Sequence, residues 1–375
     1  MATGEIQVVP VSTRKQESLF IKFPWKVYRG DPYWVPPLIS ERKRFLNPKI
    51  NPFFHHAQVK LFLAHKDKEI LGRIAAVVDD QYINYYHQKV GFFGLFECLP
   101  DYSVAYTLLQ SVEKWLKEMG METIQGPMNL STNHECGLLI EGFDSPPVFM
   151  TPYNPSYYRN YLENYGFQKV KDLYAYFIDF SRYEKGKLEE KIERVLSRRN
   201  LRVRPVNLKN FENEAQTVRE IYNSAWGNNW GFVPMTDEEF WYMGKELKKI
   251  VIPDLALIAE LDGKAVGFTL TVPDINQVLK RLNGRLFPWG IFKWFYYYKK
   301  IDVFRALILG IIEKYRHLGL DLLLYVKLAE AAKKNGYLKW EISWILEDNT
   351  AVHNVLRKRL NAQLYKKYRI FEKAI

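Results

Sequence analysis

Cysteine and long apolar runs are both scarce in this sequence. Only two cysteines, Cys98 and Cys136, occur in 375 residues, which excludes a disulfide framework and a cysteine-rich zinc motif. No stretch reaches the roughly 18 uninterrupted apolar residues that a helix needs to span a bilayer. The first residues, Met-Ala-Thr-Gly-Glu, lack the basic and apolar regions of a secretory signal. We therefore expect a cytoplasmic protein.

The sequence also lacks the motifs that often accompany a strongly basic composition. Its formal net charge is +12, yet it has no zinc-finger spacing, no RNA-recognition motif and no basic zipper helix. An anionic small molecule or a membrane surface explains the excess of Lys and Arg equally well, so we expect no nucleic-acid partner. The neighbours His55 and His56 would point to opposite sides of a strand, and we expect no metal site.

A strand–turn–helix–strand pattern near the C-terminus is the most informative feature present. An apolar strand is predicted over Ala306–Gly310, followed by a basic turn that contains Arg316 and Gly319. Apolar spacing then predicts a helix, and a second strand is predicted over Lys339–Ile345. A helix that begins behind a Gly turn offers backbone N–H groups and the positive end of its dipole, which together suit a pyrophosphate.

This segment closely resembles the acyl-CoA-binding core of the GNAT acyltransferase superfamily. The family pattern is Arg or Gln, two residues, Gly, one residue, and Gly or Ala; Arg316 and Gly319 match it, and Asp321 departs from it. The resemblance implies that acyl-CoA is the co-substrate, bound by a strand end, the turn, the helix start and an Asn after the second strand. The residues so assigned are Leu309, Gly310, Arg316, His317, Leu318, Gly319, Leu320, Asp321 and Asn349.

An internal repeat extends the resemblance to the whole chain. Two apolar strands around a charged turn are predicted at 62–76 and again at 257–271, which is the pattern of a hairpin. Gly72 and Gly267 are 195 residues apart, and so are Asn154 and Asn349. We therefore expect an α+β protein with two tandem GNAT-like domains, each a mixed twisted sheet flanked by helices. Tandem GNAT-like halves also occur in N-myristoyltransferases and Fem-type aminoacyl transferases, which the chain resembles in layout.

The two copies are predicted to differ in function. Domain boundaries are expected at 1–180 for a degenerate N-terminal copy, 181–199 for a charged linker helix, and 200–375 for a C-terminal copy with the acyl-CoA site. Where the second copy has its basic Gly turn, the first copy has Glu97 and Asp101. Two carboxylates would repel a pyrophosphate, so we expect one acyl-CoA per chain.

The resemblance also implies the mechanism, in which an amine attacks the thioester directly. The two strands of the core would splay apart so that exposed backbone pairs with the pantetheine amides, and a carboxylate or water would accept the ammonium proton. The family often protonates the leaving thiolate with a Tyr shortly after the Asn, but Leu356 and Arg357 stand there. Tyr365, Tyr368 or water would have to serve, and we assign Tyr365.

The acceptor is expected to be a small-molecule amine or a lipid-like substrate. We expect its pocket between the halves, where the polar insertion from about Asn129 to Phe149 supplies residues. Asn129, Asn133 and Tyr153 are the candidates for binding it. Glu97 and Glu135 are the candidates for binding a cationic amine or taking its proton, because few basic residues compete nearby; alternatively, Glu97 caps the following helix and Glu135 is a turn residue.

Three further interpretations remain open at this level. The protein could be a pseudo-transferase that binds CoA or a partner without turnover, or a thioester enzyme that uses Cys136 with His134. The second insertion, 276–300, holds many aromatic and basic residues and no acidic residue. Its simplest interpretation is an amphipathic element packed on its domain; the alternatives are a lid over a long acyl chain and a peripheral membrane contact.

Overall fold

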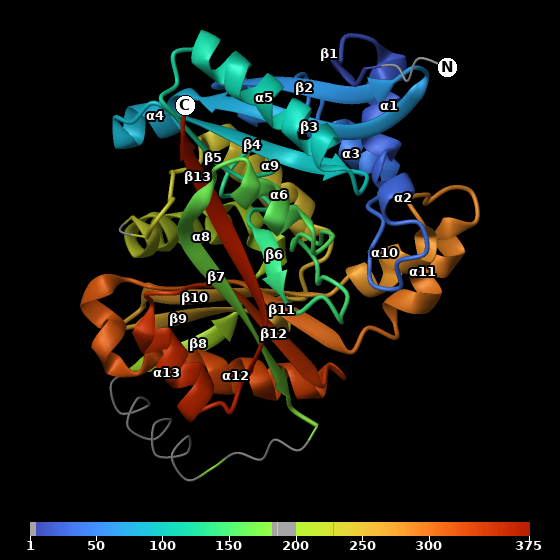
Figure 1. Cartoon of the computed structure of the whole chain (residues 1–375). Helices are drawn as coiled ribbons and strands as arrows, with labels where there is room; N and C mark the ends of the chain where they lie inside the picture. The colour runs from blue at the N-terminus through green and yellow to red at the C-terminus, as the bar shows by residue number, and fades with distance from the viewer. Residues whose placement is uncertain (1–4, 182–185, 187–199, 228) are drawn as a thin grey trace. The chain divides into compact units, whose positions relative to one another are not determined.

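A computed structural model describes residues 5–181, 186, 200–227 and 229–375 of the chain (Figure 1). The chain forms two compact units. Unit 1 consists of Met1–Tyr174, Val278–Phe295 and Lys366–Ile375, and unit 2 of Ala175–Gln277 and Tyr296–Tyr365. The linker helix expected at 181–199 lies almost entirely outside the described residues.

Unit 1 carries the first copy of the repeat. Its elements, in chain order, are β1 (Gln7–Pro10), α1 (Arg14–Lys22), α2 (Pro24–Val27), α3 (Ile39–Phe45), η1 (Pro52–His55), β2 (Ala57–Lys66), β3 (Glu69–Asp79), α4 (Asp80–Tyr86), β4 (Val90–Cys98), α5 (Tyr102–Glu118), β5 (Thr123–Gly126), β6 (Leu138–Glu141) and α6 (Tyr158–Asn164). The strands are ordered β1-β2-β3-β4-β5, with β4 and β5 parallel and the other neighbours antiparallel.

Helix α5 shows how the sequence builds the core of unit 1. The Asp101 side chain accepts a hydrogen bond from the Ser103 amide at 2.9 Å and so caps the helix start. The apolar residues of α5 then recur at helical spacing and bury one face against the sheet; they are Val104, Ala105, Leu108, Leu109, Val112 and Leu116. The helix is followed by Gly120 with φ +78°, a conformation that favours glycine.

Unit 2 carries the second copy. Its elements are β8 (Leu201–Pro205), η2 (Leu208–Asn210), α8 (Phe211–Trp226), α9 (Asp237–Lys248), η3 (Pro253–Leu255), β9 (Ala256–Leu261), β10 (Lys264–Pro273), β11 (Val303–Ile311), η4 (Glu313–Leu318), α12 (Leu320–Lys334), β12 (Lys339–Leu346) and α13 (Thr350–Lys358). The strands are ordered β8-β9-β10-β11-β12, with β11 and β12 parallel. Between β10 and β11 lie α10 (Asn276–Leu282) and α11 (Gly290–Tyr298).

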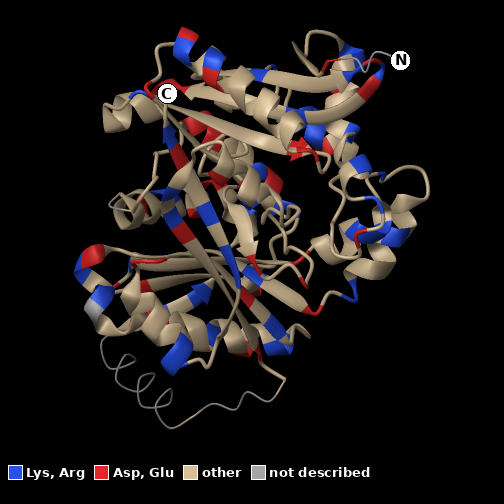
Figure 2. Cartoon of the chain, in the orientation of Figure 1, with Lys and Arg blue, Asp and Glu red and all other residues tan. Residues whose placement is uncertain are grey.

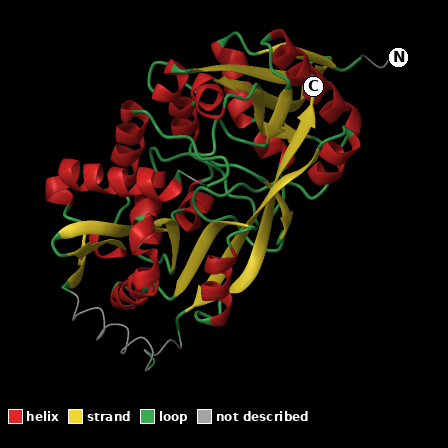
Figure 3. Cartoon of the chain, turned by 90° about the vertical axis from the view of Figure 1, so that its left-hand side faces the viewer, coloured by secondary structure: helices red, strands yellow, loops and turns green. Residues whose placement is uncertain are grey.

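The repeat predicted from the sequence is confirmed. Each copy begins with one strand and two or more helices, followed by a hairpin and a third antiparallel strand. A long helix, a parallel strand, a shorter helix and a last strand then follow in that order. Figure 3 shows helices beside the strands of each unit. The hairpins β2–β3 and β9–β10 turn at Asp67 and Asp262, both with positive φ, as the charged turns in the sequence indicate.

The last strand of each copy departs from the simple division into halves. These strands are β7 (Gln168–Asp179) and β13 (Gln363–Ala374). From Ala175 onward β7 belongs to unit 2, and from Lys366 onward β13 belongs to unit 1, where Phe371–Ala374 pairs with β5. The segment 278–295 also belongs to unit 1. Each compact unit is therefore built from segments of both halves of the sequence.

Candidate active site

In both copies the parallel pair of strands stops pairing partway along. Strand β4 pairs with β5 from Val90 to Phe92, and β11 pairs with β12 from Val303 to Ala306. Each third strand then contains one extra residue relative to its antiparallel neighbour, between Gly94 and Glu97 in β4 and at Leu307 in β11. Such a bulge bends the strand and ends its regular pairing. We call the two places the β4–β5 fork and the β11–β12 fork.

The β4–β5 fork is filled by the chain itself. The Met128 amide donates to the Phe93 carbonyl at 2.7 Å, and the Asn129 side chain accepts from the Leu95 amide at 2.8 Å. Gly94 is required here, because an added Cβ would lie 1.8 Å from the Met128 carbonyl oxygen. Backbone groups of β4 that could pair with a pantetheine chain are thus already bonded to residues 128 and 129.

The β11–β12 fork continues into the turn that the sequence assigned to acyl-CoA. Leu309 and Gly310 pair with β10 on the other side of β11, and Gly310 admits no Cβ because the Trp226 ring would lie 2.3 Å away. Arg316, His317 and Leu318 lie in η4, so a turn of 3₁₀-helix stands where we expected a tight turn. Leu320 and Asp321 form the first turn of α12.

Gly319 joins η4 to α12 in a left-handed conformation with φ +74°. An added Cβ would meet no atom within 4 Å, so the backbone angle and not a lack of space calls for glycine here. No side chain of the described residues caps the start of α12, a helix of 15 residues. Gly319 therefore offers no side-chain oxygen to accept hydrogen bonds from the first N–H groups of α12 or to interact with the positive end of the helix dipole.

Two other residues assigned to acyl-CoA have structural partners. The Arg316 guanidinium donates to the Ala225 carbonyl at the end of α8 (2.7 Å) and to the Ile311 carbonyl (3.3 Å), and so fastens η4 beside α8. Asn349 caps α13, because its side-chain oxygen accepts from the Val352 amide at 3.3 Å.

A buried charged cluster lies where β11 and β12 stop pairing. Arg305 and Glu341 are paired across the two strands, with 3.3 Å between Arg305 Nε and Glu341 Oε2, and they are 2% and 0% exposed. The Tyr365 hydroxyl donates to Glu341 Oε1 at 3.2 Å, and Arg305 Nη2 donates to the Ser343 hydroxyl at 3.3 Å. The sequence alone points to Tyr365 but not to Arg305, Glu341 or Ser343.

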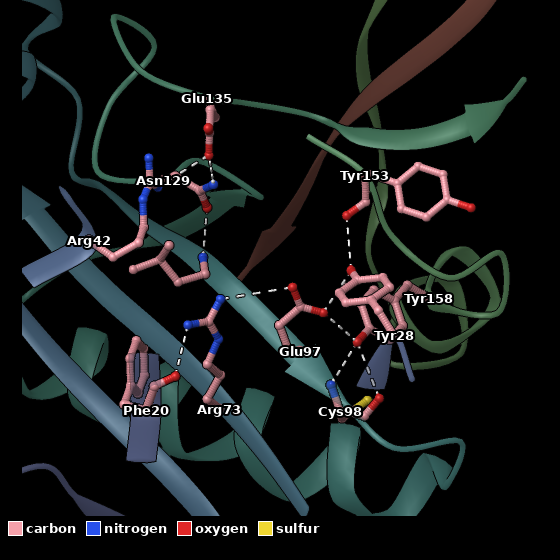
Figure 4. A network of polar contacts seen from close by, with 11 residues as sticks. Phe20, Tyr28, Arg42, Arg73, Glu97, Cys98, Asn129, Glu135, Tyr153 and Tyr158 are labelled. Atoms are coloured by element: carbon pink, nitrogen blue, oxygen red, sulfur yellow. Dashed lines mark hydrogen bonds and ion pairs between the residues drawn. The ribbon is translucent and has the colours of Figure 1, made fainter. Parts of the chain in front are cut away.

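In unit 1, Glu97 is the centre of a buried polar network (Figure 4). Its Oε2 is 2.9 Å from the hydroxyls of both Tyr28 and Tyr158, and its Oε1 is 3.9 Å from Arg73 Nη2. Burial raises the pKa of Glu97 to about 7, although Arg73 and the two tyrosines act in the opposite direction. Asp101, and not Glu97, caps α5, so the alternative that Glu97 is a helix cap is wrong.

The hydroxyls around Glu97 can accommodate both of its protonation states. Tyr28 Oη also lies 2.9 Å from the Tyr153 carbonyl, and Tyr158 Oη lies 3.2 Å from the Cys98 carbonyl. When Glu97 is ionised, both hydroxyls can donate to it; when it is protonated, it can donate to one hydroxyl, which turns its own proton to a carbonyl. The network can therefore exchange one proton without leaving a buried carboxylate oxygen unsatisfied.

Glu135 and Asn129 lie in the same view (Figure 4), together with Arg42. The Asn129 amide group donates to Glu135 Oε2 at 2.9 Å, and Arg42 Nη1 lies 3.5 Å from that oxygen. Tyr153 contributes its carbonyl to Tyr28, while its hydroxyl donates to Asp31 Oδ2 at 3.2 Å. The backbone amide of Asn133 donates to the Ser131 hydroxyl at 3.2 Å. The structure thus brings three of these candidates, Glu97, Glu135 and Asn129, to the bulged end of β4.

His134, the residue considered above as a partner of Cys136, contacts other side chains. His134 Nδ1 lies 2.9 Å from the Ser131 hydroxyl, and the His134 ring packs edge-on against Phe45 and Phe53. Cys136 is buried. Burial also raises the pKa of the Cys98 thiol well above its ordinary value, which disfavours the nucleophilic thiolate.

Two further properties bear on ligands. Among the described residues, no cluster of three or more His, Cys, Asp or Glu side chains could hold a metal ion. None of the helices formed by the described residues is long and apolar enough to cross a membrane.

Comparison with known proteins gives the family. The chain is 37% identical to protein YghO of Escherichia coli over 363 residues, which cover 95% of this chain and 92% of that protein. It is 34% identical to the bacterial ceramide synthase of Caulobacter vibrioides over 382 aligned positions, covering 99% and 98% of the two chains. No family model matches the sequence.

Solved structures give the fold. A tandem GNAT protein from the clavulanic acid biosynthesis pathway superposes with a TM-score of 0.58, over 99% of this chain and 98% of that one, at 9% identity. At that identity the likeness concerns the fold alone, and it agrees with the repeated order of elements and the two forks described above. The chain therefore belongs to the protein family of YghO and the bacterial ceramide synthase, and it has the fold of tandem GNAT proteins.

Proposed function

We propose that the protein transfers a fatty acyl group from acyl-CoA to the amine of a long-chain, lipid-like acceptor, and that acyl-CoA binds at the β11–β12 fork. The observation that carries the proposal is the difference between the two forks. The first is filled by Met128 and Asn129, whereas the second leads into Gly319 and the start of α12, which no side chain caps. That arrangement suits a pantetheine chain along β11 and a pyrophosphate at the helix start.

The family supports a lipid-like acceptor. One relative is named a ceramide synthase, and a ceramide is the amide of a fatty acid with a long-chain amino alcohol. An amide of this kind forms when a neutral amine attacks the thioester carbonyl, the nitrogen loses a proton and the CoA thiolate leaves and is protonated. The reaction therefore needs one proton acceptor and one proton donor.

We assign these roles to residues that the structure places in polar clusters. Glu97 is the proposed proton acceptor, because its pKa of about 7 lets it be ionised and still basic near neutral pH. Glu135, with Asn129, Asn133 and Tyr153, is proposed to bind the acceptor. Tyr365 is the proposed donor to the thiolate. The family often has a Tyr shortly after the Asn, but here Leu356 and Arg357 stand at that place. Leu356 is fully buried and apolar and cannot donate a proton.

The activity is tested by free thiol release from acyl-CoAs of increasing chain length, mixed with long-chain amino alcohols and with short amines. We expect thiol release that requires both substrates, together with an amide product of matching mass. Saturable acyl-CoA binding in a thermal-shift assay without any amide would instead identify a pseudo-transferase. Thiol release without an amine would indicate a thioesterase and overturn the proposal.

Gly319→Val is expected to weaken acyl-CoA binding at least tenfold in calorimetry. A β-branched residue disfavours φ near +74°, at a cost on the order of 1–3 kcal/mol, so the turn must shift away from its present geometry. Gly319→Asn is the matched control, because Asn tolerates the left-handed region and should keep most of the affinity. The same titration should show one acyl-CoA per chain. Unchanged affinity in a folded Gly319→Val variant, or two equivalent sites, contradicts the assignment.

A further inference from the structure

The most exposed aromatic side chains of the described residues gather on one segment. Phe287, Trp289, Phe292, Phe295 and Tyr296 are 58–75% exposed, whereas the other large apolar residues that reach the surface are only 41–45% exposed. All five lie on α11 or in the turn before it. We call residues 285–300 the aromatic arm. The sequence-based interpretation of a packed amphipathic element holds for one side of this arm only.

The exposed aromatics form a single stripe. Phe292, Phe295 and Tyr296 are spaced by three and one residues, which places them on one face of α11, and Trp289 directly precedes the helix. The Trp289 and Phe292 rings lie 6.4 Å apart. On the other side, Gly290 is buried, and a Cβ there would lie 2.3 Å from the Arg285 carbonyl oxygen. The helix therefore presents aromatic side chains outward.

The arm is fastened at its base to the N-terminal helices of unit 1. Trp25 Nε1 donates to the Asn283 side chain at 2.8 Å, and the Ile39 amide donates to the Gly284 carbonyl at 3.0 Å. Gly284 has φ +80°, and a Cβ there would lie 2.5 Å from the Trp25 ring. Lys280 also donates to the Pro32 carbonyl. The aromatic stripe is thus held on a fixed base, which reduces the entropy lost when it binds a surface.

The arm is also uniformly basic. No acidic residue occurs between Asn276 and Lys300, and the exposed cations flank the stripe; they are Arg285, Lys293, Lys299 and Lys300. Lys300 lies over the Tyr296 ring at 4.0 Å. Figure 2 shows Lys and Arg as blue bands on α10 and α11. An anionic surface would complement this charge.

We propose that the aromatic arm binds the surface of a membrane that contains anionic lipid, with the aromatic rings in the headgroup region and the cations at the lipid phosphates. Trp, Tyr and Phe beside Lys and Arg are the side chains that favour this interfacial position. A protein partner fits less well, because Lys is depleted from the centres of protein–protein interfaces. The inference goes beyond acyl transfer, because it concerns where the enzyme acts and not what it makes.

The test is flotation of the full chain with phosphatidylcholine vesicles, with and without phosphatidylglycerol. We expect binding that requires phosphatidylglycerol and weakens with salt. Trp289→Ser with Phe292→Ser should lower the bound fraction about tenfold or more, as the loss of two buried aromatic rings predicts. The control is Ile50→Ser with Tyr106→Ser, two exposed apolar residues outside the arm, which should bind as the unmodified chain does.

Charge is tested separately with two variants that have the same net charge as each other. Arg285→Glu with Lys293→Glu should abolish the dependence on phosphatidylglycerol, whereas Arg14→Glu with Lys15→Glu, exposed cations elsewhere, should leave it intact. Brominated lipids should quench more tryptophan fluorescence in the unmodified chain than in Trp289→Phe. Equal vesicle binding by all variants overturns the proposal. A second result also overturns it. If the unmodified chain sediments as a dimer, the Trp289→Ser with Phe292→Ser variant sediments as a monomer, and neither binds vesicles, then the arm is an interface between two copies.

Discussion

Glu97→Gln should lower the turnover number by roughly 10²–10⁴-fold with little change in acyl-CoA affinity, as expected for the loss of a general base. The substitution keeps the shape of the side chain and its contacts with Tyr28 and Tyr158 while removing the proton-accepting oxygen. The turnover number of the unmodified enzyme should rise as pH passes through about 7, because the base must be ionised. Glu97→Gln should lack this step.

Tyr158→Phe separates a chemical role from a structural one. The Tyr158 hydroxyl favours the ionised form of Glu97, so its removal should raise the pKa of Glu97 further and move the midpoint of the pH–rate profile upward. A network that only stabilises the fold would not move that midpoint. If Glu97→Gln and Glu135→Gln both keep full turnover between pH 6 and 9, the proton is accepted elsewhere and the Glu97 network is structural.

The raised pKa of Glu97 has a separate consequence for stability. Between the ordinary value of 4.5 and about 7, the folded protein holds a proton on Glu97 that the unfolded chain has released. The free energy of unfolding therefore decreases as pH rises through this interval, by on the order of 3 kcal/mol, and is constant above it. Glu97→Gln removes this contribution, so urea denaturation of the variant should depend less on pH between 5 and 7.

Local signals in the sequence were enough to find the core of the second copy. The strand predicted at Ala306–Gly310 is β11 (Val303–Ile311), and the one predicted at Lys339–Ile345 is β12 (Lys339–Leu346). Apolar runs bounded by Gly, Asn and charged residues define such elements without reference to the rest of the fold. The repeat was visible for the same reason, because the charged turns of both hairpins are local.

The buried charges could not be found in this way. Glu341 and Ser343 alternate with apolar residues, which is the pattern of a strand with one face in water, yet both are buried. Arg305, the partner of Glu341, lies on a different strand, and Tyr28 and Arg73 likewise reach Glu97 from other segments of the chain. Such pairings depend on the register of the sheet, which no single segment encodes.

The exposure of the aromatic arm could likewise not be predicted from the local pattern of the sequence. A stripe of Trp, Phe and Tyr at helical spacing is usually the buried face of its helix, which is why packing was the simplest interpretation of residues 276–300. Here the contacts of Gly284 and Gly290 set the orientation of α11, and both depend on a neighbouring segment or turn. Composition identified the arm, and its orientation came only from the structure.

Glu341→Ala should destabilise the protein by about 3–5 kcal/mol, because it leaves the Arg305 guanidinium buried without its ionic partner. The free energy of unfolding in urea measures this cost. Combining Arg305→Met with Glu341→Leu removes both charges and should recover most of the stability, since well-packed apolar residues often replace a buried ion pair without loss. A Glu341→Ala variant as stable as the unmodified chain contradicts the account of this pair.

Activity of the stabilised double variant then decides what the charges are for. An apolar pair would serve packing equally well, so the fold alone does not call for Arg305 and Glu341 at the β11–β12 fork. Glu341 accepts a hydrogen bond from Tyr365, the proposed donor to the leaving thiolate, and thereby holds the Tyr365 ring and hydroxyl oxygen in place; the hydroxyl must turn its proton from Glu341 to the thiolate when the thiolate leaves. If the double variant is folded and binds acyl-CoA but turns over slowly, the pair positions Tyr365. If its turnover is unchanged, neither charge takes part in acyl transfer, and Tyr365 does not depend on Glu341 for its position.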